Sequence, residues 1–222
     1  PSGTPCTIGW RRQNGDSGAY NSILEEDGSS SHPAWELEGN VLTIELDWHV
    51  CQHPGDVAVN VSLSCSFGCP MEGDVPAAEV LGWAQRFIDL GVQGITLCDT
   101  TGMAHPTQVH DLVSAFKARW PQTTLTLHFH DTRAMALANV LAAIAAGANR
   151  FDASVGGMGG CPYAPGASGN ACTEELVHAL QLMGYDTGVD VAALTAVAAS
   201  LPALIGHATP SAIVQAGPAG QL

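Results

Sequence analysis

The sequence has little positive charge. Its 222 residues include 7 lysines and arginines against 21 aspartates and glutamates, which gives a formal net charge of −14 at pH 7. Nucleic acids and anionic membranes are bound through clustered cations, because attraction to phosphate and the release of counterions supply the affinity. The sequence shows no such cluster. We therefore expect neither a nucleic acid nor a membrane as a partner.

Long apolar runs and a regular cysteine spacing are also missing. The longest apolar stretch, 134–148, is interrupted by Asn139 and falls short of the roughly 20 residues that a helix needs to cross a bilayer. The seven cysteines are an odd number and follow no disulfide framework, which favours a reducing compartment. No basic and then apolar leader opens the sequence. These features lead us to expect a cytoplasmic protein.

The first 56 residues contain little regular patterning. Residues 1–40 are rich in Gly, Ser, Asn and Asp, and no apolar period persists there for the length of an element. Apolar and polar residues alternate over 41–50, which is typical of a strand. We predict that residues 1–56 form an atypical N-terminal segment, largely loop, with one candidate strand at 41–50.

Residues 57–222 alternate between strand-like and helix-like patterns. A period of two predicts four strands, and helical spacing of apolar residues predicts a helix after each of them. The predicted strands are 57–67, 94–99, 123–130 and 150–155, the helices that follow them are near 80–88, 106–120, 132–146 and 173–183, and a further helix is at 191–204.

Four strand–helix units in succession imply parallel strands joined by right-handed crossovers. Several predicted strands carry small or polar side chains on one face, whereas strands of an open sheet between two helical layers tend to be apolar on both faces. A barrel can carry polar side chains inward near its catalytic end. We therefore predict an α/β fold of the (β/α)8 TIM-barrel type, with only half of its eight units visible and C-terminal helices after them.

Two histidines stand out on the third predicted strand. His128 and His130 are two residues apart near its carboxyl end, so both imidazoles leave the same face and can chelate one divalent cation. A pair of hydrogen-bonded core histidines is the alternative. Because Asp131 follows directly, and because barrel enzymes carry their chemistry at this end of the strands, we favour the metal.

Two carboxylates lie near the carboxyl ends of predicted strands. Asp99 ends the second predicted strand and Asp152 lies on the fourth, near their carboxyl ends. Each could orient a ligand or a metal-binding histidine. Each could equally cap the following turn or helix, and the residues alone leave both interpretations open.

A glycine-rich segment, GGMGGCPYAPGASGN, spans 156–170. Glycine allows backbone angles and close approaches that other residues do not. The segment matches neither the dinucleotide-binding nor the Walker pattern. We interpret it as a lid loop that carries Cys161 as a candidate proton donor. Asn170, at its end, is either an oxygen ligand or the N-cap of the next helix, and without further information we favour the cap.

Five segments together resemble the hydroxymethylglutaryl-CoA lyases, which are metal-dependent enzymes built on a TIM barrel. The match runs in order from about Val57 to Ala216. The segments are SCSFGCPMEGDV, CDTTGMAHP, LHFHDTRAMALANVLAA, FDASVGGMGGCPYAPGASGN and TGVD. The HxHD motif is shared with isopropylmalate and homocitrate synthases, whereas GGCPYAPGASGN resembles the signature of the lyases alone.

The resemblance implies an activity and a set of site residues. It implies a carbon–carbon lyase of leucine degradation that cleaves a CoA thioester, 3-hydroxy-3-methylglutaryl-CoA, into acetyl-CoA and acetoacetate with Mg²⁺ or Mn²⁺. By motif position the metal ligands are His128, His130 and Asn170, and the catalytic residues are His128, Asp99 and Cys161. The chain corresponds to the last four strand–helix units of that barrel.

The first 56 residues depart from the family. They contain no counterpart of the Arg-Asp pair of its first strand or the Glu of its second strand. The alternatives are therefore a truncated, catalytically impaired fragment, a metal-binding remnant, or a related acyl-CoA lyase or aldolase. A further reading lets strand 41–50 replace a missing strand, with Glu45, Asp47 or His49 as a fourth ligand. Because a half-barrel has open strand edges, we expect a homodimer or higher self-association.

Overall fold

The computed structural model describes the backbone of residues 6–11, 23–24, 30–31, 35–38 and 41–46, and describes residues 59–160 and 169–219 in full. The chain divides into two compact units, Pro1–Val57 and Ala58–Leu222. Within the described ranges, no helix combines the length and the apolar character needed to cross a membrane.

The N-terminal unit contains more strand than its sequence suggests. A three-stranded antiparallel sheet has the order β1 (Cys6–Arg11), β5 (Val41–Leu46) and β4 (Trp35–Glu38), and β2 (Ile23–Leu24) pairs with β3 (Ser30–Ser31). The sequence predicts mostly loop over 1–40 and does not predict the four short strands β1 to β4. The alternation in β1 is only six residues long and includes a glycine, which weakens it as a sequence signal.

The strand expected at 41–50 is present as β5 over Val41–Leu46. It pairs on both sides with antiparallel neighbours, so both of its hydrogen-bonding edges are in use. A strand of a parallel barrel needs parallel neighbours. The reading in which this strand replaces a missing barrel strand is therefore wrong, and Asp47 and His49 lie outside the described residues.

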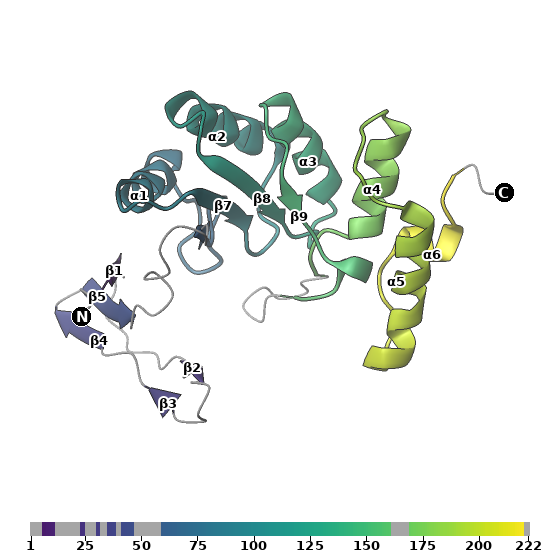
Figure 1. Cartoon of the computed structure of the whole chain (residues 1–222), viewed down its shortest axis with the longest axis horizontal. Helices are drawn as coiled ribbons and strands as arrows, with labels where there is room; N and C mark the ends of the chain where they lie inside the picture. The colour runs from purple at the N-terminus through teal and green to yellow at the C-terminus, as the bar shows by residue number, and fades with distance from the viewer. Residues whose placement is uncertain are drawn as a thin grey trace. The chain divides into compact units, whose positions relative to one another are not determined.

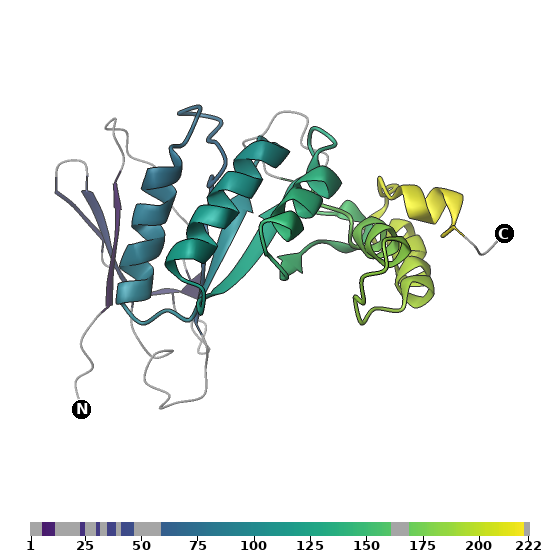
Figure 2. The same ribbon diagram turned by 90° about the horizontal axis from the view of Figure 1, so that it is seen from above.

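The second unit is built on the predicted parallel sheet. Its order is β6 (Asn60–Leu63), β7 (Gly94–Asp99), β8 (Thr124–Phe129) and β9 (Phe151–Asp152), and all three pairings are parallel. Figures 1 and 2 show three helices along one face of this sheet: α1 (Ala77–Asp89), α2 (Pro106–Arg119) and α3 (Ala136–Ala145). Sequential parallel strands with a helix after each one confirm the predicted strand–helix units.

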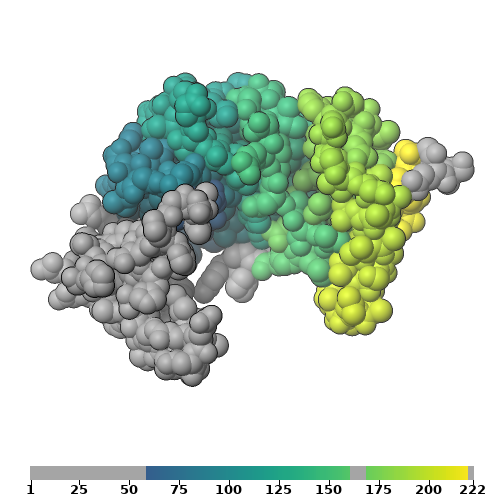
Figure 3. Space-filling model, viewed as in Figure 1, coloured from purple at the N-terminus to yellow at the C-terminus, as the bar shows by residue number. Residues whose placement is uncertain are grey.

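Three further helices follow the sheet. A short 3-10 turn, η2 (Val155–Gly157), leads from β9 into the glycine-rich segment, and α4 (Thr173–Leu182) follows that segment. The chain then forms α5 (Val191–Ile205) and α6 (Ala212–Ala216). These three helices pack on one another, and Figure 3 shows α4 and α5 as one continuous surface.

The register of β7 and β8 separates a core face from a polar face. Ile95 pairs with Leu125, Leu97 with Leu127, and these four side chains belong to the hydrophobic core with the helices. The intervening pairs carry the opposite face of the sheet. They are Thr96 with Thr126 and Cys98 with His128. The predicted polar inner face is therefore present on these two strands.

Two predicted boundaries move where the backbone turns left-handed. Strand β6 ends at Leu63 rather than residue 67, and Cys65 has a φ of 57°. Helix α3 begins at Ala136 rather than 132, and Ala134 has a φ of 54°. The Asp131 carboxylate accepts a hydrogen bond from the N–H of Ala136 at 2.9 Å and so fixes the start of the helix. Left-handed angles are uncommon for residues other than glycine, so the sequence pattern does not signal these turns.

Candidate metal centre

The two predicted histidines lie side by side at the carboxyl end of β8. His128 belongs to the strand, and His130 forms an antiparallel bridge with Asn170 just beyond it. The centroids of the two imidazole rings are 5.2 Å apart, and the ring planes cross at 66°. The chain therefore brings both rings and Asn170 to one place, as a shared metal site requires.

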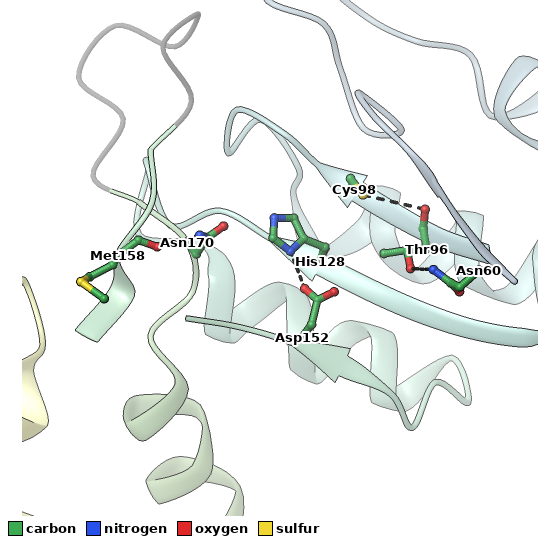
Figure 4. A network of polar contacts seen from close by, with 7 residues as sticks. All are labelled: Asn60, Thr96, Cys98, His128, Asp152, Met158 and Asn170. Atoms are coloured by element: carbon green, nitrogen blue, oxygen red, sulfur yellow. Dashed lines mark hydrogen bonds and ion pairs between the residues drawn. The ribbon is translucent and has the colours of Figure 1, made fainter. Parts of the chain in front are cut away.

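Asp152 orients the first of these histidines. It is the register partner of His128 on β9, and its carboxylate contacts His128 Nδ1 (Figure 4). This hydrogen bond is the main reason that the pKa of His128 lies above its ordinary value, although burial acts in the opposite direction. A carboxylate only accepts, so Nδ1 donates and Nε2 is left as a potential ligand. Of the two roles considered for Asp152, the contact supports orientation of a histidine.

His130 is buried, with 7% of its surface exposed. Burial, and next the proximity of His128, lower the pKa of His130, which favours the neutral ring that a metal requires. Its Nδ1 atom has no hydrogen-bond partner among the described residues. A buried nitrogen without a partner costs roughly 1–3 kcal/mol, a cost that a bound cation would remove.

Asn170 presents an oxygen to the same place. Its Nδ2 group donates to the carbonyl oxygen of Met158 at 2.7 Å. Its buried Oδ1 has no close hydrogen-bond partner in the part of the chain that the structure describes, and a weaker contact of the Asn170 side chain with His128 contributes to the raised pKa of that histidine. Because a carbonyl can only accept, the nitrogen must face Met158, and the free oxygen faces away from it. Helix α4 has Cys172 as its N-cap residue, so the interpretation of Asn170 as the cap is wrong.

These donors fit a divalent cation. Two imidazoles and a carbonyl oxygen suit first-row divalent ions, and two of the three residues carry buried atoms without partners. Among the residues that the structure describes, no group of three or more His, Cys, Asp and Glu could hold a metal by itself. Three protein donors are fewer than the ligands that Mg²⁺ or Mn²⁺ takes, so the set would leave room for other ligands.

Asp99 takes a different position. It pairs in register with Phe129, a core residue, so it lies on the face opposite to His128. One carboxylate oxygen accepts the N–H groups of Met103 at 2.7 Å and Ala104 at 3.1 Å. Burial raises the pKa of Asp99, and these bonds oppose the shift. Asp99 therefore reaches the site from the other face of the sheet: its charge contributes to the raised pKa of His128, and its Oδ2 atom has no partner among the described residues. Its contacts support the turn-capping alternative, and its catalytic role stays a prediction.

The glycine-rich segment is closely packed at its two ends. Cys161 lies outside the described residues, so its role as a proton donor stays a prediction. A Cβ atom placed on Gly169 would lie 2.0 Å from the carbonyl oxygen of Gly157, and one placed on Gly159 would lie 2.8 Å from Asn170 Nδ2. Glycines therefore let the two ends meet beside Asn170.

One buried residue near the site escaped the sequence patterns. Glu174, in the first turn of α4, is fully buried and contacts the backbone of Gly156. Acidic residues are common in the first turn of a helix, and Glu175 next to it has the same signal. Glu174 differs from Glu175 in being buried, and the local sequence does not predict that burial.

Parallel strand–helix units with polar side chains gathered at the carboxyl ends of the strands define an α/β protein of the TIM-barrel type. A comparison of structures supports this class. An HMG-CoA lyase of Acinetobacter baumannii, solved in complex with coenzyme A and 3-methylmalate, superimposes with a TM-score of 0.70 and 49% identity, over 73% of this chain and 53% of that one.

The chain belongs to the HMGL-like family, whose model matches residues 51–201. It is 44% identical over 153 residues to a hydroxymethylglutaryl-CoA lyase of Bacillus subtilis, a match that covers 69% of this chain and 51% of the relative. It is also 44% identical over 158 residues to an (R)-citramalyl-CoA lyase of Chloroflexus aurantiacus, which covers 71% and 50%. The chain spans about half the length of the curated relatives it matches. The family and the barrel type predicted from the sequence are confirmed.

Proposed function

We propose that the chain provides the metal-binding half of a carbon–carbon lyase that cleaves 3-hydroxy-3-methylglutaryl-CoA into acetyl-CoA and acetoacetate with Mg²⁺ or Mn²⁺. One observation carries this proposal. Beside His128, the buried atoms His130 Nδ1 and Asn170 Oδ1 have no partner among the described residues. The Bacillus relative and the coenzyme A of the Acinetobacter structure support the substrate class.

In this proposal His128, His130 and Asn170 hold the cation, which when bound polarises the oxygens of the substrate. Asp152 keeps the proton on Nδ1 of His128 and leaves Nε2 for the ligand role. With Nδ1 bonded to Asp152 and Nε2 assigned to the cation, this proposal gives His128 a part in metal binding, and its predicted catalytic role stays a prediction.

The reaction also needs a base and an acid. Cleavage takes a proton from the tertiary hydroxyl group and delivers one to the enolate carbon of acetyl-CoA. We assign the delivery to Cys161. Cys98, on the same face as His128, is a poor substitute because burial, and next the charge of Asp152, raise its pKa to about 12. Asp99 caps the turn at Met103 and Ala104, and its predicted catalytic role stays a prediction.

A second candidate substrate is (R)-citramalyl-CoA. The Chloroflexus relative that carries this name is as similar to the chain as the Bacillus lyase is. Both substrates are 3-hydroxyacyl thioesters, so the same metal site and the same proton transfers serve either of them. The two substrates differ in the acyl chain beyond the hydroxyl carbon, so side chains near that part of the acyl group would select between them.

An assay of the 222-residue chain with Mn²⁺ and each thioester tests the activity. We expect slow release of acetyl-CoA from 3-hydroxy-3-methylglutaryl-CoA, because the described sheet has four of the eight strands of a barrel. The matched control contains a chelator in place of Mn²⁺. Faster release from (R)-citramalyl-CoA would favour the second candidate, and no metal-dependent release from either would contradict the proposal.

We also propose that the chain associates with itself as a dimer or larger assembly. Strands β6 and β9 are the two edges of the described parallel sheet, and Asn60 and Ser62 of β6 are exposed. Unpaired strand edges favour association, and a second copy would bring four more parallel strands. Sedimentation velocity at micromolar concentration should show a dimer or larger species. A monomer at all concentrations would contradict this proposal.

We place the protein in the cytoplasm and its reaction in leucine degradation. The free thiols of Cys69, Cys98 and Cys172 support a reducing compartment. The net charge of −14 argues against nucleic acid or membrane as partners. Fractionation of the source cells tests the location.

A further inference from the structure

Glu174 is an unusual residue for a helix start. Its side chain has 0% of its surface exposed. A buried carboxylate is costly unless hydrogen bonds satisfy it. Here the backbone nitrogen of Gly156 donates to the carboxylate and lies 3.1 Å from each of its oxygens, and the side chains of Ser211 and Cys172 also bond to it. Burial alone would raise the pKa of Glu174, but these bonds outweigh it and lower the pKa. The buried group is therefore a carboxylate at neutral pH.

The partner of this carboxylate opens the glycine-rich segment. Gly156 has a left-handed backbone with a φ of 67°. A Cβ atom placed on it would lie 2.9 Å from Thr209 Cγ2 and 3.1 Å from Leu201 Cδ1. Gly156 is thus enclosed between Glu174 on one side and Thr209 and Leu201 on the other. In this enclosed position its N–H group donates to the carboxylate of Glu174.

The turn that starts at Gly156 ends at the contact that orients Asn170. The carbonyl oxygen of Met158, two residues later, accepts the hydrogen bond from Asn170 Nδ2 at 2.7 Å. Gly157 packs against the backbone oxygen of Asn170. Figure 4 shows Met158 and Asn170 on neighbouring segments. Because Glu174 follows Asn170 by only four residues, it ties the two ends of the glycine-rich segment to each other.

We propose that Glu174 is a positioning residue that fixes the side-chain amide of Asn170 through the Gly156–Met158 turn, so that Oδ1 faces the metal position. This rests on the proposed function for the role of the oxygen, but the orientation of the amide is a property of the metal-free chain. Removal of the charge loosens the turn, releases the Met158 carbonyl and lets the amide of Asn170 rotate.

The variant Glu174→Gln keeps the shape of the side chain and removes its charge. The matched control is Glu175→Gln, in the same helical turn, where the carboxylate accepts the N–H of Ala212 at 2.6 Å instead. We expect Glu174→Gln to move the Asn170 side-chain amide signals in a ¹H–¹⁵N spectrum toward free-amide values. We also expect it to weaken Mn²⁺ binding about tenfold or more, as loss of a residue that supports a ligand does. Glu175→Gln should change neither readout.

A third variant separates positioning from stability. Ser211→Ala removes one partner of Glu174 and the side-chain cap of α6 but keeps the carboxylate and its bond to Gly156. We expect a lower melting temperature and an unchanged Mn²⁺ affinity. Equal losses of affinity in Ser211→Ala and Glu174→Gln would reduce Glu174 to a structural role and overturn the proposal. If Glu174→Gln does not fold, Glu174→Asp, which keeps the charge but is shorter, takes its place.

The two proposals fail in different ways. If the unmodified chain does not bind Mn²⁺, the proposed function fails, and the Asn170 amide signals still decide the role of Glu174. If the unmodified chain binds Mn²⁺ and Glu174→Gln leaves both the amide signals and the affinity unchanged, the positioning role is overturned while the metal site stands.

Discussion

His130→Ala should weaken Mn²⁺ binding by about a hundredfold or more. The substitution removes one of three protein donors, whereas loss of a residue that only supports a ligand already costs about 10–100-fold. His130 is buried and its Nδ1 atom has no partner within the described residues, so the ring is available to bind a cation. Isothermal titration of the metal-free chain with Mn²⁺ measures the change directly.

The control for this experiment is His110→Ala. His110 lies on α2, with half of its side chain exposed, and it bonds to the neighbouring Asp111 rather than to the histidine pair. We expect its variant to bind Mn²⁺ like the unmodified chain. Equal binding by His130→Ala and the unmodified chain would remove His130 from the metal site and with it the observation on which the proposed function depends.

The histidine pair was predictable because it depends on local geometry. Residues two apart on a strand share a face whatever the rest of the fold does. Asn170 is different, because its place depends on a bridge to His130 across 40 residues of chain and on its bond to Met158. Residues alone favoured a helix cap there, and only the family resemblance indicated a ligand.

The two carboxylates show what strand register adds. Asp99 and Asp152 both come at the carboxyl ends of strands, and their sequence signals are equivalent. Asp152 is in register with His128 and shares its face, while Asp99 is in register with Phe129 and points to the other face. One residue of offset relative to β8, the strand between them, puts Asp152 on the face of His128 and Asp99 on the opposite face. A single strand pattern does not contain that offset.

Apolar periodicity predicts most helices and strands of the second unit. It does not predict where they end, because the ends depend on local turns. Helix α2 starts at Pro106, as predicted, because proline suits a first turn. The early end of β6 and the late start of α3 depend on left-handed angles at Cys65 and Ala134. In the N-terminal unit the alternating pattern over 41–50, which contains β5, is long enough to recognise, whereas the shorter patterns of β1 to β4 are not.

Gly169→Ala should destabilise the chain by about 3 kcal/mol or more and abolish Mn²⁺ binding. A Cβ atom at this position would lie 2.0 Å from the carbonyl oxygen of Gly157. The backbone would have to move apart to relieve this clash. Gly169 also has a φ of 118°, which disfavours any side chain. Backbone strain and overpacking each cost roughly 1–3 kcal/mol. Because Asn170 is the next residue, the shift displaces the proposed oxygen ligand. Urea denaturation and Mn²⁺ titration measure the two effects.

Gly184→Ala separates strain from the clash. Gly184 also has a left-handed backbone, with a φ of 86°, but a Cβ atom there would meet nothing within 4 Å. Its substitution should cost only about 1 kcal/mol, the price of the backbone angle alone, and leave Mn²⁺ binding intact. The difference between the two variants then measures the close contact between the ends of the glycine-rich segment. Similar losses of stability in Gly169→Ala and Gly184→Ala would mean that the two ends of the glycine-rich segment can separate freely. Retained metal binding in Gly169→Ala would mean that the contact between these ends does not hold Asn170 in place.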